Sequence, residues 1–395
     1  MGYATRATVV LSCLALCVAT VLDIGSTPVA AKVQSPAHSA LQTAAVLTVI
    51  SGDVQTRFGG SGFASATDGA VLYVGSTVRT SSDARAVITL FEGSTIELEP
   101  ASDITIEEAT TRSSSTIVQL VQSVGRSWHV VTHLTTADSR YEVRTPAATA
   151  SVRGTAFEVA VDDGSIGSST TVTTTEGRVA TADSAGSSEV LVTADQVTTV
   201  HANTAPEPPR SAPEAQRVVS VAVMSESSLV VDPLGRTNGF KDGKVFAQTP
   251  GARVRRQDGT IVVTLPNVPD GVFSTTVATG AAATVSTTVT DKGEEPVTVS
   301  HAVEASGASA TSSVELRKGS DKPQMRSLTS DETQKLSDAK FSAKSTARAT
   351  AIPTQGAAAP TQASRATLAP TKKSDMILPP ASTARRTPSP LPTRR

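Results

Sequence analysis

The sequence predicts an all-β protein with two β domains and an unstructured C-terminal tail. Aromatic residues make up only 3% of the 395 residues and charged residues 18%, whereas Thr, Ser, Ala and Val are abundant. β-Branched side chains suit pleated sheets, and few aromatic rings mean small cores. Short alternating runs separated by Gly, Asp and Ser, at intervals of roughly 8–12 residues, indicate sandwiches, barrels or solenoids. A prior of about 150 residues per domain allows two or three such units.

The first 31 residues are typical of a secretory signal peptide. Met1–Arg6 carries one positive charge, Ala7–Leu22 carries none, and the small residues Val29–Ala31 fit a cleavage directly after them. A spanning helix needs about 20 apolar residues, so the uncharged run is short for a membrane anchor, which is the alternative. Either interpretation places the remainder outside the cytoplasm. Cys13 and Cys17 both lie in this segment, so cleavage leaves a chain without disulfides or thiolate metal sites.

Residues 41–203 have the pattern of a first β domain. No window of this range shows the apolar stripe of an amphipathic helix, and glycine-containing turn signals separate the apolar runs. The clearest predicted strands are Val46–Ile50, Ala86–Leu90, Ile96–Leu98, Ile104–Ile106, Thr116–Val121, Trp128–Val131, Tyr141–Val143, Phe157–Val161 and Val190–Val192.

A Pro-rich segment, residues 204–217, predicts a stiff linker to a second β domain at residues 218–317. About seven alternating runs over about 100 residues fit an Ig-like β-sandwich, although the Cys-Trp-Cys signature of antibody domains is absent. The second domain is therefore inferred from size and pattern alone.

Residues 318–395 consist mainly of Ser, Thr, Ala, Pro, Lys and Arg and are predicted to be disordered, because so few apolar residues cannot offset the ordering entropy. A short helix over residues 331–344 is the alternative for its start. From Lys340 to Arg395, ten basic residues face Asp375 alone, a net charge of +9 in a chain of −1. This basic tail indicates contact with anionic polymers, or a solubilising role. It lacks the interleaved aromatic residues of a nucleic-acid-binding segment.

An ordered series of motifs over residues 46–198 resembles the FecR-type extracytoplasmic domain. Its most specific part is Thr-Pro-Ala, from Thr145, followed by Val-Arg-Gly-Thr, from Val152. The resemblance implies a twisted β-solenoid-like or β-roll domain that contacts a protein or a wall component. The motifs are, in order, Ile50–Val54, Gly69–Leu72, Val74–Thr80, Ala84–Ser102, Gly125–Val130, Tyr141–Phe157, Glu176–Val179 and Val192–Gln196.

In the best-known members of that family, a cytoplasmic anti-sigma segment and one spanning helix precede the domain. Such proteins relay the state of an outer-membrane transporter to an ECF-type sigma factor. Only Met1–Arg6 precedes the apolar run here. The sigma-binding half of the family's function is therefore not expected for this sequence.

Twelve residues of the motifs are expected to be structural. Glycine in a turn adopts positive φ without a steric penalty, and Pro146 suits a strand end because it has no N–H for a ladder. Gly154 is expected to relieve a close backbone approach or a bulge. Trp128 and Tyr141 are expected to pack in the core rather than form a ligand platform. The twelve residues are Gly52, Gly75, Thr80, Gly93, Trp128, Thr145, Pro146, Arg153, Gly154, Thr155, Phe157 and Gly177.

Two histidines and two aspartate-containing segments are candidate metal ligands. His129 and His133 have zincin spacing without its Glu, and on one face of a strand they lie about 13 Å apart, too far to share an ion. They are expected to be exposed strand residues. Asp162–Gly164 and Asp232–Asn238 fit turns better than Ca²⁺ loops. The sequence therefore predicts no metal and no cofactor.

Several glutamates invite a glycosidase interpretation, in which two carboxylates flank a sugar. Glu97 and Glu99 instead alternate with Ile96 and Leu98, which favours a solvated polar strand face. No Gly-x-Ser-x-Gly elbow is present, so an enzyme is not expected.

The sequence thus predicts a non-catalytic, secreted or extracytoplasmic protein of the periplasm or cell surface. Its expected role is regulatory or signalling, through binding to an envelope protein or a cell-wall polymer. The alternative is a structural surface or cell-wall protein anchored by the basic tail. No nucleic acid is expected as a partner, and membrane contact is expected only through an uncleaved N-terminal segment.

Overall fold

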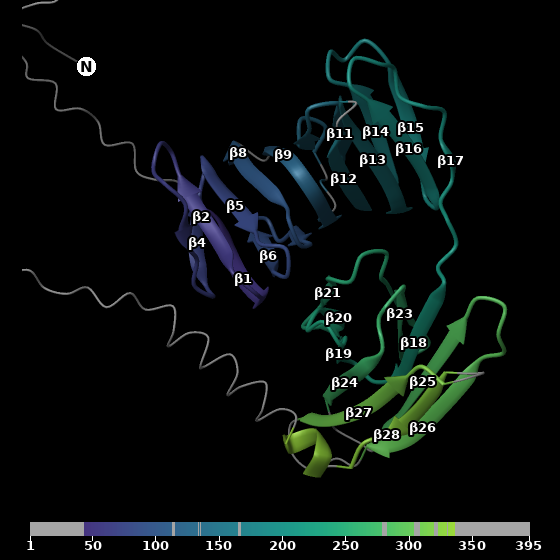
Figure 1. Ribbon diagram of the computed structural model, residues 1–395. Helices are drawn as coiled ribbons and strands as arrows, with labels where there is room; N and C mark the ends of the chain where they lie inside the picture. The colour runs from purple at the N-terminus through teal and green to yellow at the C-terminus, as the bar shows by residue number, and fades with distance from the viewer. Residues whose placement is uncertain are drawn as a thin grey trace, which may run out of the picture. The chain divides into compact units, whose positions relative to one another are not determined.

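The computed structural model describes residues 43–112, 115–132, 134, 136–164, 167–278, 283–303, 309–319, 323–329 and 331–335 (Figure 1). The predicted signal peptide and most of the predicted tail lie outside these residues. The described residues are strands and turns apart from one helical turn at residues 331–335, so the all-β prediction is confirmed.

Strands β1–β17 form one hydrogen-bonded sheet that folds into two layers, here called layer A and layer B. Layer A has the order β4 (Ala70–Tyr73), β1 (Thr43–Ser51), β6 (Arg85–Leu90), β7 (Thr95–Leu98), β9 (Ser115–Val130), β12 (Ala156–Gly164), β13 (Gly167–Glu176), β16 (Gln196–His201) and β17 (Arg210–Ser211). Layer B has the order β3 (Ala64–Ser65), β2 (Val54–Phe58), β5 (Ser76–Thr80), β8 (Asp103–Arg112), β9, β10 (Arg140–Arg144), β11 (Ala148–Val152), β14 (Arg178–Asp183) and β15 (Glu189–Thr193).

The chain passes back and forth between the layers, which is the roll-like winding that the family resemblance implies. Alternate residues of each strand point inward, and one core unites both layers. Leu47 and Ile88 enter this core from layer A, and Ile104 and Tyr141 enter it from layer B. All four side chains are fully buried.

Strand β9 belongs to both layers and changes from one to the other at Gly125. Its first half pairs with β8 and β10, and its second half, from Gly125 onward, pairs with β12. Gly125 has a φ of 87°, and a Cβ atom there would lie 2.5 Å from Ser102 Cα and 2.6 Å from the Ala101 carbonyl oxygen. Only glycine combines this φ with so close a backbone approach.

A second β region, residues 217–327, consists of two antiparallel sheets around a separate core that includes Val221, Leu265 and Phe273. One sheet has the order β22 (Arg253–Gln257), β23 (Thr260–Pro266), β18 (Arg217–Met224), β25 (Ala283–Asp291) and β26 (Val297–Val303). The other has the order β21 (Lys244–Ala247), β20 (Thr237–Lys241), β19 (Ser228–Val231), β24 (Gly271–Ala278), β27 (Ser309–Arg317) and β28 (Gln324–Ser327).

The second region is a sandwich with more strands than the sequence indicates. Eleven strands lie in its described residues, against about seven expected, because short polar strands such as β20 and β22 carry too few apolar residues to show an alternating pattern. Strand β28 pairs with β27 inside the range predicted to be disordered, and β17 pairs with β16 inside the predicted linker. Both are short edge strands. Such strands form by hydrogen bonding to a neighbouring strand, and their own composition does not predict them.

Replacing Gly125 with Ala is expected to lower the free energy of unfolding by about 2 kcal/mol or more, through left-handed strain and a clash with backbone atoms. Gly186 is the matched control, because its φ is also positive, at 68°, but a Cβ there would meet no atom within 4 Å. Its replacement with Ala should cost about 1 kcal/mol. Urea unfolding measures both variants, and equal losses would contradict the assigned role of Gly125.

Candidate functional site

A row of residues on the outer face of layer A is buried although it points away from the layer's own core. Val87, Glu97, Trp128 and Glu158 lie side by side across β6, β7, β9 and β12. The exposed fractions of Val87, Glu97 and Trp128 are only 1–2%. The second β region contacts Glu97 and Trp128, and Glu158 is partly exposed; we call these four residues the covered row.

Trp128 connects the covered row to the end of β21. Its indole Nε1–H donates a hydrogen bond of 2.7 Å to the carbonyl oxygen of Ala247. Val130, two residues along β9, packs against the core of the second region. The expectation that Trp128 packs in the core is thus refined, because its ring lies between two β regions.

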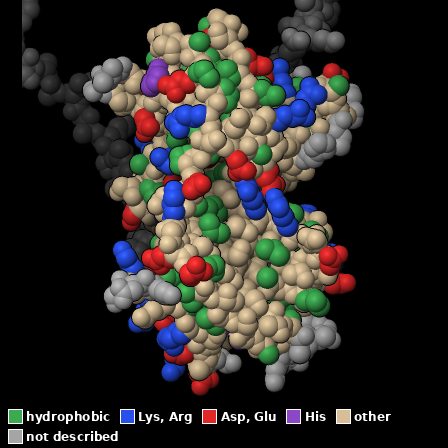
Figure 2. All heavy atoms as spheres, turned by 90° about the vertical axis from the view of Figure 1, so that its right-hand side faces the viewer, with side chains coloured by type: hydrophobic (Ala, Val, Ile, Leu, Met, Phe, Trp, Pro, Cys, Tyr) green, Lys and Arg blue, Asp and Glu red, His purple; other side chains and the backbone are tan. Residues whose placement is uncertain are grey.

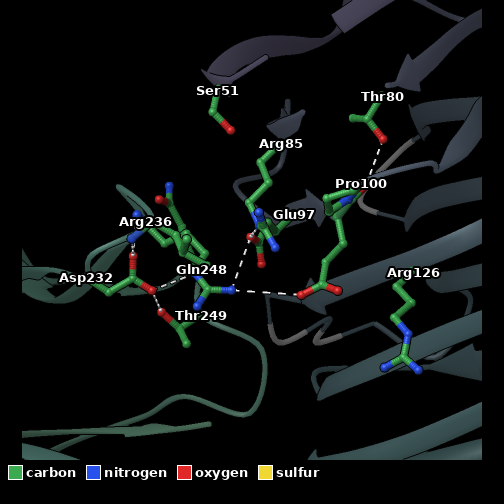
Figure 3. A network of polar contacts seen from close by, with 12 residues as sticks. Ser51, Thr80, Arg85, Glu97, Pro100, Arg126, Asp232, Arg236, Gln248 and Thr249 are labelled. Atoms are coloured by element: carbon green, nitrogen blue, oxygen red, sulfur yellow. Dashed lines mark hydrogen bonds and ion pairs between the residues drawn. The ribbon is translucent and has the colours of Figure 1, made fainter. Parts of the chain in front are cut away.

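Arg236 is the buried charged residue that reaches from the second region to layer A (Figure 3), whereas the partly exposed Arg253 bonds the Thr175 carbonyl oxygen and Asp195. Its Nη1 lies 3.6 Å from Glu97 Oε1 and 3.9 Å from Glu99 Oε1. Its Nε donates a 2.6 Å hydrogen bond to Asp232 Oδ2. Arg236 is only 4% exposed and Asp232 is fully buried. The result is a chain of ionisable groups, most of them buried, that runs from one region into the other.

The turn between β19 and β20 holds Arg236 in place. Asp232 Oδ1 accepts the backbone N–H groups of Leu234 and Arg236 at 2.9 and 3.0 Å. Thr249 Oγ1 donates to Asp232 Oδ2 at 3.0 Å, and the Asn238 amide bonds Thr249 twice, at 2.9 Å each. The predicted turn at Asp232–Asn238 therefore orients an arginine.

Among the residues that the structure describes, no group of three metal-ligating side chains occurs.

Glu97 is the electrostatically strained member of the covered row. Burial raises its pKa to about 8, and nearby Glu99 adds to the rise, while Arg236 and Arg85 oppose it. Neither carboxyl oxygen has a hydrogen-bond partner, and nor does the Arg85 Nε atom, which lies 3.9 Å from Oε1. Glu97 therefore keeps its proton at neutral pH, and the firm ion pair of Arg236 is the one with Asp232.

The expectation that Glu97 and Glu99 form a solvated face is wrong for Glu97. Glu97 is 1% exposed, and 24% of the Glu99 side chain is exposed. The alternation along β7 correctly indicated that the two glutamates share a face. It carried no information about what packs on that face.

Beside the covered row, a cleft of about 720 Å³ lies between the first and the second β region. Thr173 and Glu158 line its layer A side, and Arg253 and Pro266 line the opposite side. Glu158 pairs with Arg126 at 3.5 Å, and burial raises the pKa of Glu158. On the face shown in Figure 2, acidic and basic side chains gather across the middle of the molecule. The cleft thus has a mixed polar and apolar lining, which includes Trp128 and Arg236 of the contact.

His129 is buried, which corrects the expectation of an exposed strand histidine. It points into the core of the first region, where its ring stacks on Phe157 at 4.8 Å. Burial lowers the pKa of His129 to about 3, so the ring is neutral. The second half of β9 is covered on both faces, a situation that the local sequence does not reveal. His133 lies outside the described residues.

Ser127, His129 and Tyr141 form a buried hydrogen-bonded chain with Gln122. The Gln122 amide donates to the carbonyl oxygens of Gly125 and Val159, so its Oε1 accepts from the Ser127 hydroxyl. His129 Nε2 then donates to Ser127 Oγ at 2.6 Å, and Nδ1 accepts from the Tyr141 hydroxyl at 2.8 Å. The Ser127 proton is directed away from His129, so the chain is arranged to satisfy buried polar groups rather than to activate a nucleophile.

The three threonines of the family motifs tie turns and strands together. Thr80 Oγ1 donates to the Glu99 carbonyl oxygen at 2.7 Å, and Thr155 Oγ1 donates to that of Arg178 at 3.1 Å. Thr145 Oγ1 accepts from the Ala148 N–H at 2.9 Å.

The other motif residues do not gather at one place. Phe157 is in the core, Trp128 is in the covered row, and Pro146 and Arg153 are exposed. The motif glycines Gly52, Gly75, Gly93, Gly154 and Gly177 all have positive φ.

Arg236 and Ala247 were not predicted from the sequence. They are the residues of the second β region that bond Glu97 and Trp128 of the covered row. A usable signal was the Asp232-x-x-x-Arg236 spacing across a Pro-Leu-Gly turn, which places a carboxylate and a guanidinium within reach of each other. No signal identified Ala247, because it contributes only its backbone carbonyl.

Within the described part of the chain, the structure contains no helix with the length and hydrophobicity needed to cross a membrane.

Comparison with known families matches residues 76–180 to the model described as FecR protein. Two crystal structures of a "putative anti-sigma factor" from Parabacteroides distasonis ATCC 8503, at 2.50 and 1.65 Å resolution, share 13% and 15% identity with this chain. Each superposes with a TM-score of 0.29 and covers 47% of this chain and 96% or 97% of its own. A comparison with curated proteins found no match.

The free energy of unfolding is expected to fall as the pH rises from about 4.5 to about 8, because the folded protein keeps the Glu97 proton over that range and the unfolded chain loses it. One such proton lowers the free energy of unfolding by at most about 1.4 kcal/mol for each pH unit of the rise. Glu97→Gln should remove this contribution, and Glu107→Gln, at an exposed site of the same region, should retain it. Denaturant unfolding at several pH values tests this, and identical profiles for Glu97→Gln and the unaltered protein would refute the buried, protonated state.

Proposed function

We propose, from the premise that residues 76–180 belong to a FecR domain, that the protein is a regulatory module that acts by binding a protein partner outside the cytoplasm. The matched residues run from β5 to the start of β14, so they include the centre of both layers. This match is the observation that carries the proposal, since FecR proteins have a regulatory role. The sigma-factor step of the family is not part of the proposal.

The surfaces of the FecR region suit recognition. The outer face of layer B carries ion pairs, such as Arg144–Glu107 at 3.4 Å, with both side chains exposed, and Arg79–Asp103 at 2.7 Å, in which only Arg79 is exposed. Exposed pairs of this kind contribute little to stability and are available to a polar partner. The one serine–histidine contact of the region is enclosed in the core, away from any substrate. These features favour binding over catalysis.

An extracytoplasmic location rests on the predicted signal peptide and on the FecR match. A chain that loses Cys13 and Cys17 with its signal peptide has no thiol, so its folding does not depend on the redox state of the compartment. The partner in this proposal is an envelope protein.

Affinity capture from cross-linked cell envelopes tests the proposal. The intact protein should recover one envelope protein reproducibly, and a variant unfolded by Gly125→Val should not recover it. Deleting the gene for that partner should alter the same set of transcripts as deleting the gene for this protein. If no reproducible partner is recovered, or if the two deletions change unrelated transcripts, the proposal is contradicted.

The basic tail supports a second candidate, a surface protein held by anionic wall polymers. Its net charge of +9 would be attracted to such polymers, and salt screens this attraction beyond about 8 Å at physiological ionic strength. Removing residues 340–395 should therefore release the protein from isolated walls at low salt. The intact protein should need high salt for release, and equal retention of both proteins at low salt would rule this anchoring out.

A further inference from the structure

We propose that the covered row of layer A is a docking surface for an arginine-bearing turn, which the second β region occupies until a protein partner with such a turn displaces it. The inference rests on the proposed partner-binding function and adds the surface and the chemistry of the partner.

The surface has the chemistry of an arginine site. Glu97 and Glu158 belong to the covered row, and Glu99 lies next to it. Trp128 provides a flat ring and one N–H donor in the middle of the row. A turn that presents a guanidinium and a free carbonyl oxygen satisfies both kinds of group, as Arg236 and Ala247 do.

Apart from Arg253, which donates to the Thr175 carbonyl oxygen at 3.3 Å and pairs with Asp195, the occupant makes its polar contacts with the covered row and Glu99 at two points. One is Arg236 on the β19–β20 turn, and the other is the Ala247 carbonyl oxygen at the end of β21. Gly235, in the same turn, approaches Ile50 so closely that a Cβ atom would lie 3.3 Å from its Cγ2. A partner that presents one tight turn and a neighbouring strand end can replace the contact at these two points.

The intramolecular fit is incomplete. Charge-assisted hydrogen bonds are typically about 2.7–2.9 Å long, whereas Arg236 stays 3.6 and 3.9 Å from Glu97 and Glu99. Its closest bond is to Asp232 in its own turn. Both Glu97 oxygens and Arg85 Nε therefore lack hydrogen bonds in a buried place. An arginine that is not shared with Asp232 approaches Glu97 more closely and has an advantage over the internal occupant.

The two β regions are built to separate without unfolding. Each has its own core, and Val130 of β9 is the residue of the first region that packs against the edge of the second core. Between β17 and β18 the chain has no strand at residues 212–216, and the 720 Å³ cleft already separates part of the facing surfaces. Release exposes Trp128 and leaves both cores intact.

The single tryptophan of the sequence makes release measurable in the full chain. Arg236→Gln keeps a donor for Asp232 but removes the positive charge from Glu97 and Glu99. Acrylamide quenching of Trp128 should rise several-fold in this variant, with an unchanged far-ultraviolet circular dichroism spectrum. Arg255→Gln, at an exposed position of the same region, should leave the quenching unchanged. Unchanged quenching in Arg236→Gln overturns the proposal.

The second step tests the chemistry of the partner. A cyclised peptide that copies residues 229–240 is added to the Arg236→Gln protein, and the protection of Trp128 is followed as a titration. The peptide should restore protection, and its counterpart with Gln at the position of Arg236 should bind at least about tenfold more weakly. Equal binding of both peptides, or protection by wall-polymer fragments alone, overturns the proposal. Because purified protein is used throughout, failure here is distinct from failure to find an envelope partner.

Discussion

Burial of the covered row is the constraint on which the described structure depends. Glu97 and Trp128 are polar or amphipathic groups on the outside of a β layer, and a buried polar group destabilises the fold unless it has a partner. Arg236 and the Ala247 carbonyl oxygen provide partners from the second region. Arg236 can do so because Asp232, Asn238 and Thr249 hold its turn in place through hydrogen bonds within the second region. Arg236 offsets the burial of Glu97 only in part. In our proposal, this incomplete pairing allows a partner to replace the second region at the covered row.

The alternation of apolar residues was sufficient to predict the fold class. Inward residues such as Ile88, Ile104 and Val159 recur at every second position and are fully buried, as a period of two requires. The chain reversals that the sequence marked with glycine are also real, since Gly52, Gly93 and Gly177 all have positive φ. Short polar strands such as β17 and β28 could not be predicted, because they form by adding to an existing edge.

The candidate site was only half predictable, for a physical reason. Period two reveals that Glu97 and Trp128 point outward, but it does not reveal whether water or protein lies outside. A solvated face and a face covered by a second domain have the same local pattern, so the sequence predicts a solvated Glu97 where the structure buries it. The family motifs did not resolve this, because most of them, such as Thr80 and Thr155, hold turns and strands of the scaffold.

The central claim is that Trp128 is enclosed between two β regions with its indole N–H bonded to Ala247. The indole N–H of this residue gives one identifiable resonance in a ¹H–¹⁵N correlation spectrum, because the sequence has a single tryptophan. The structure predicts that this proton exchanges with solvent far more slowly than that of a free indole. Exchange at the rate of an exposed tryptophan would show that the second region does not cover layer A, and would contradict the account.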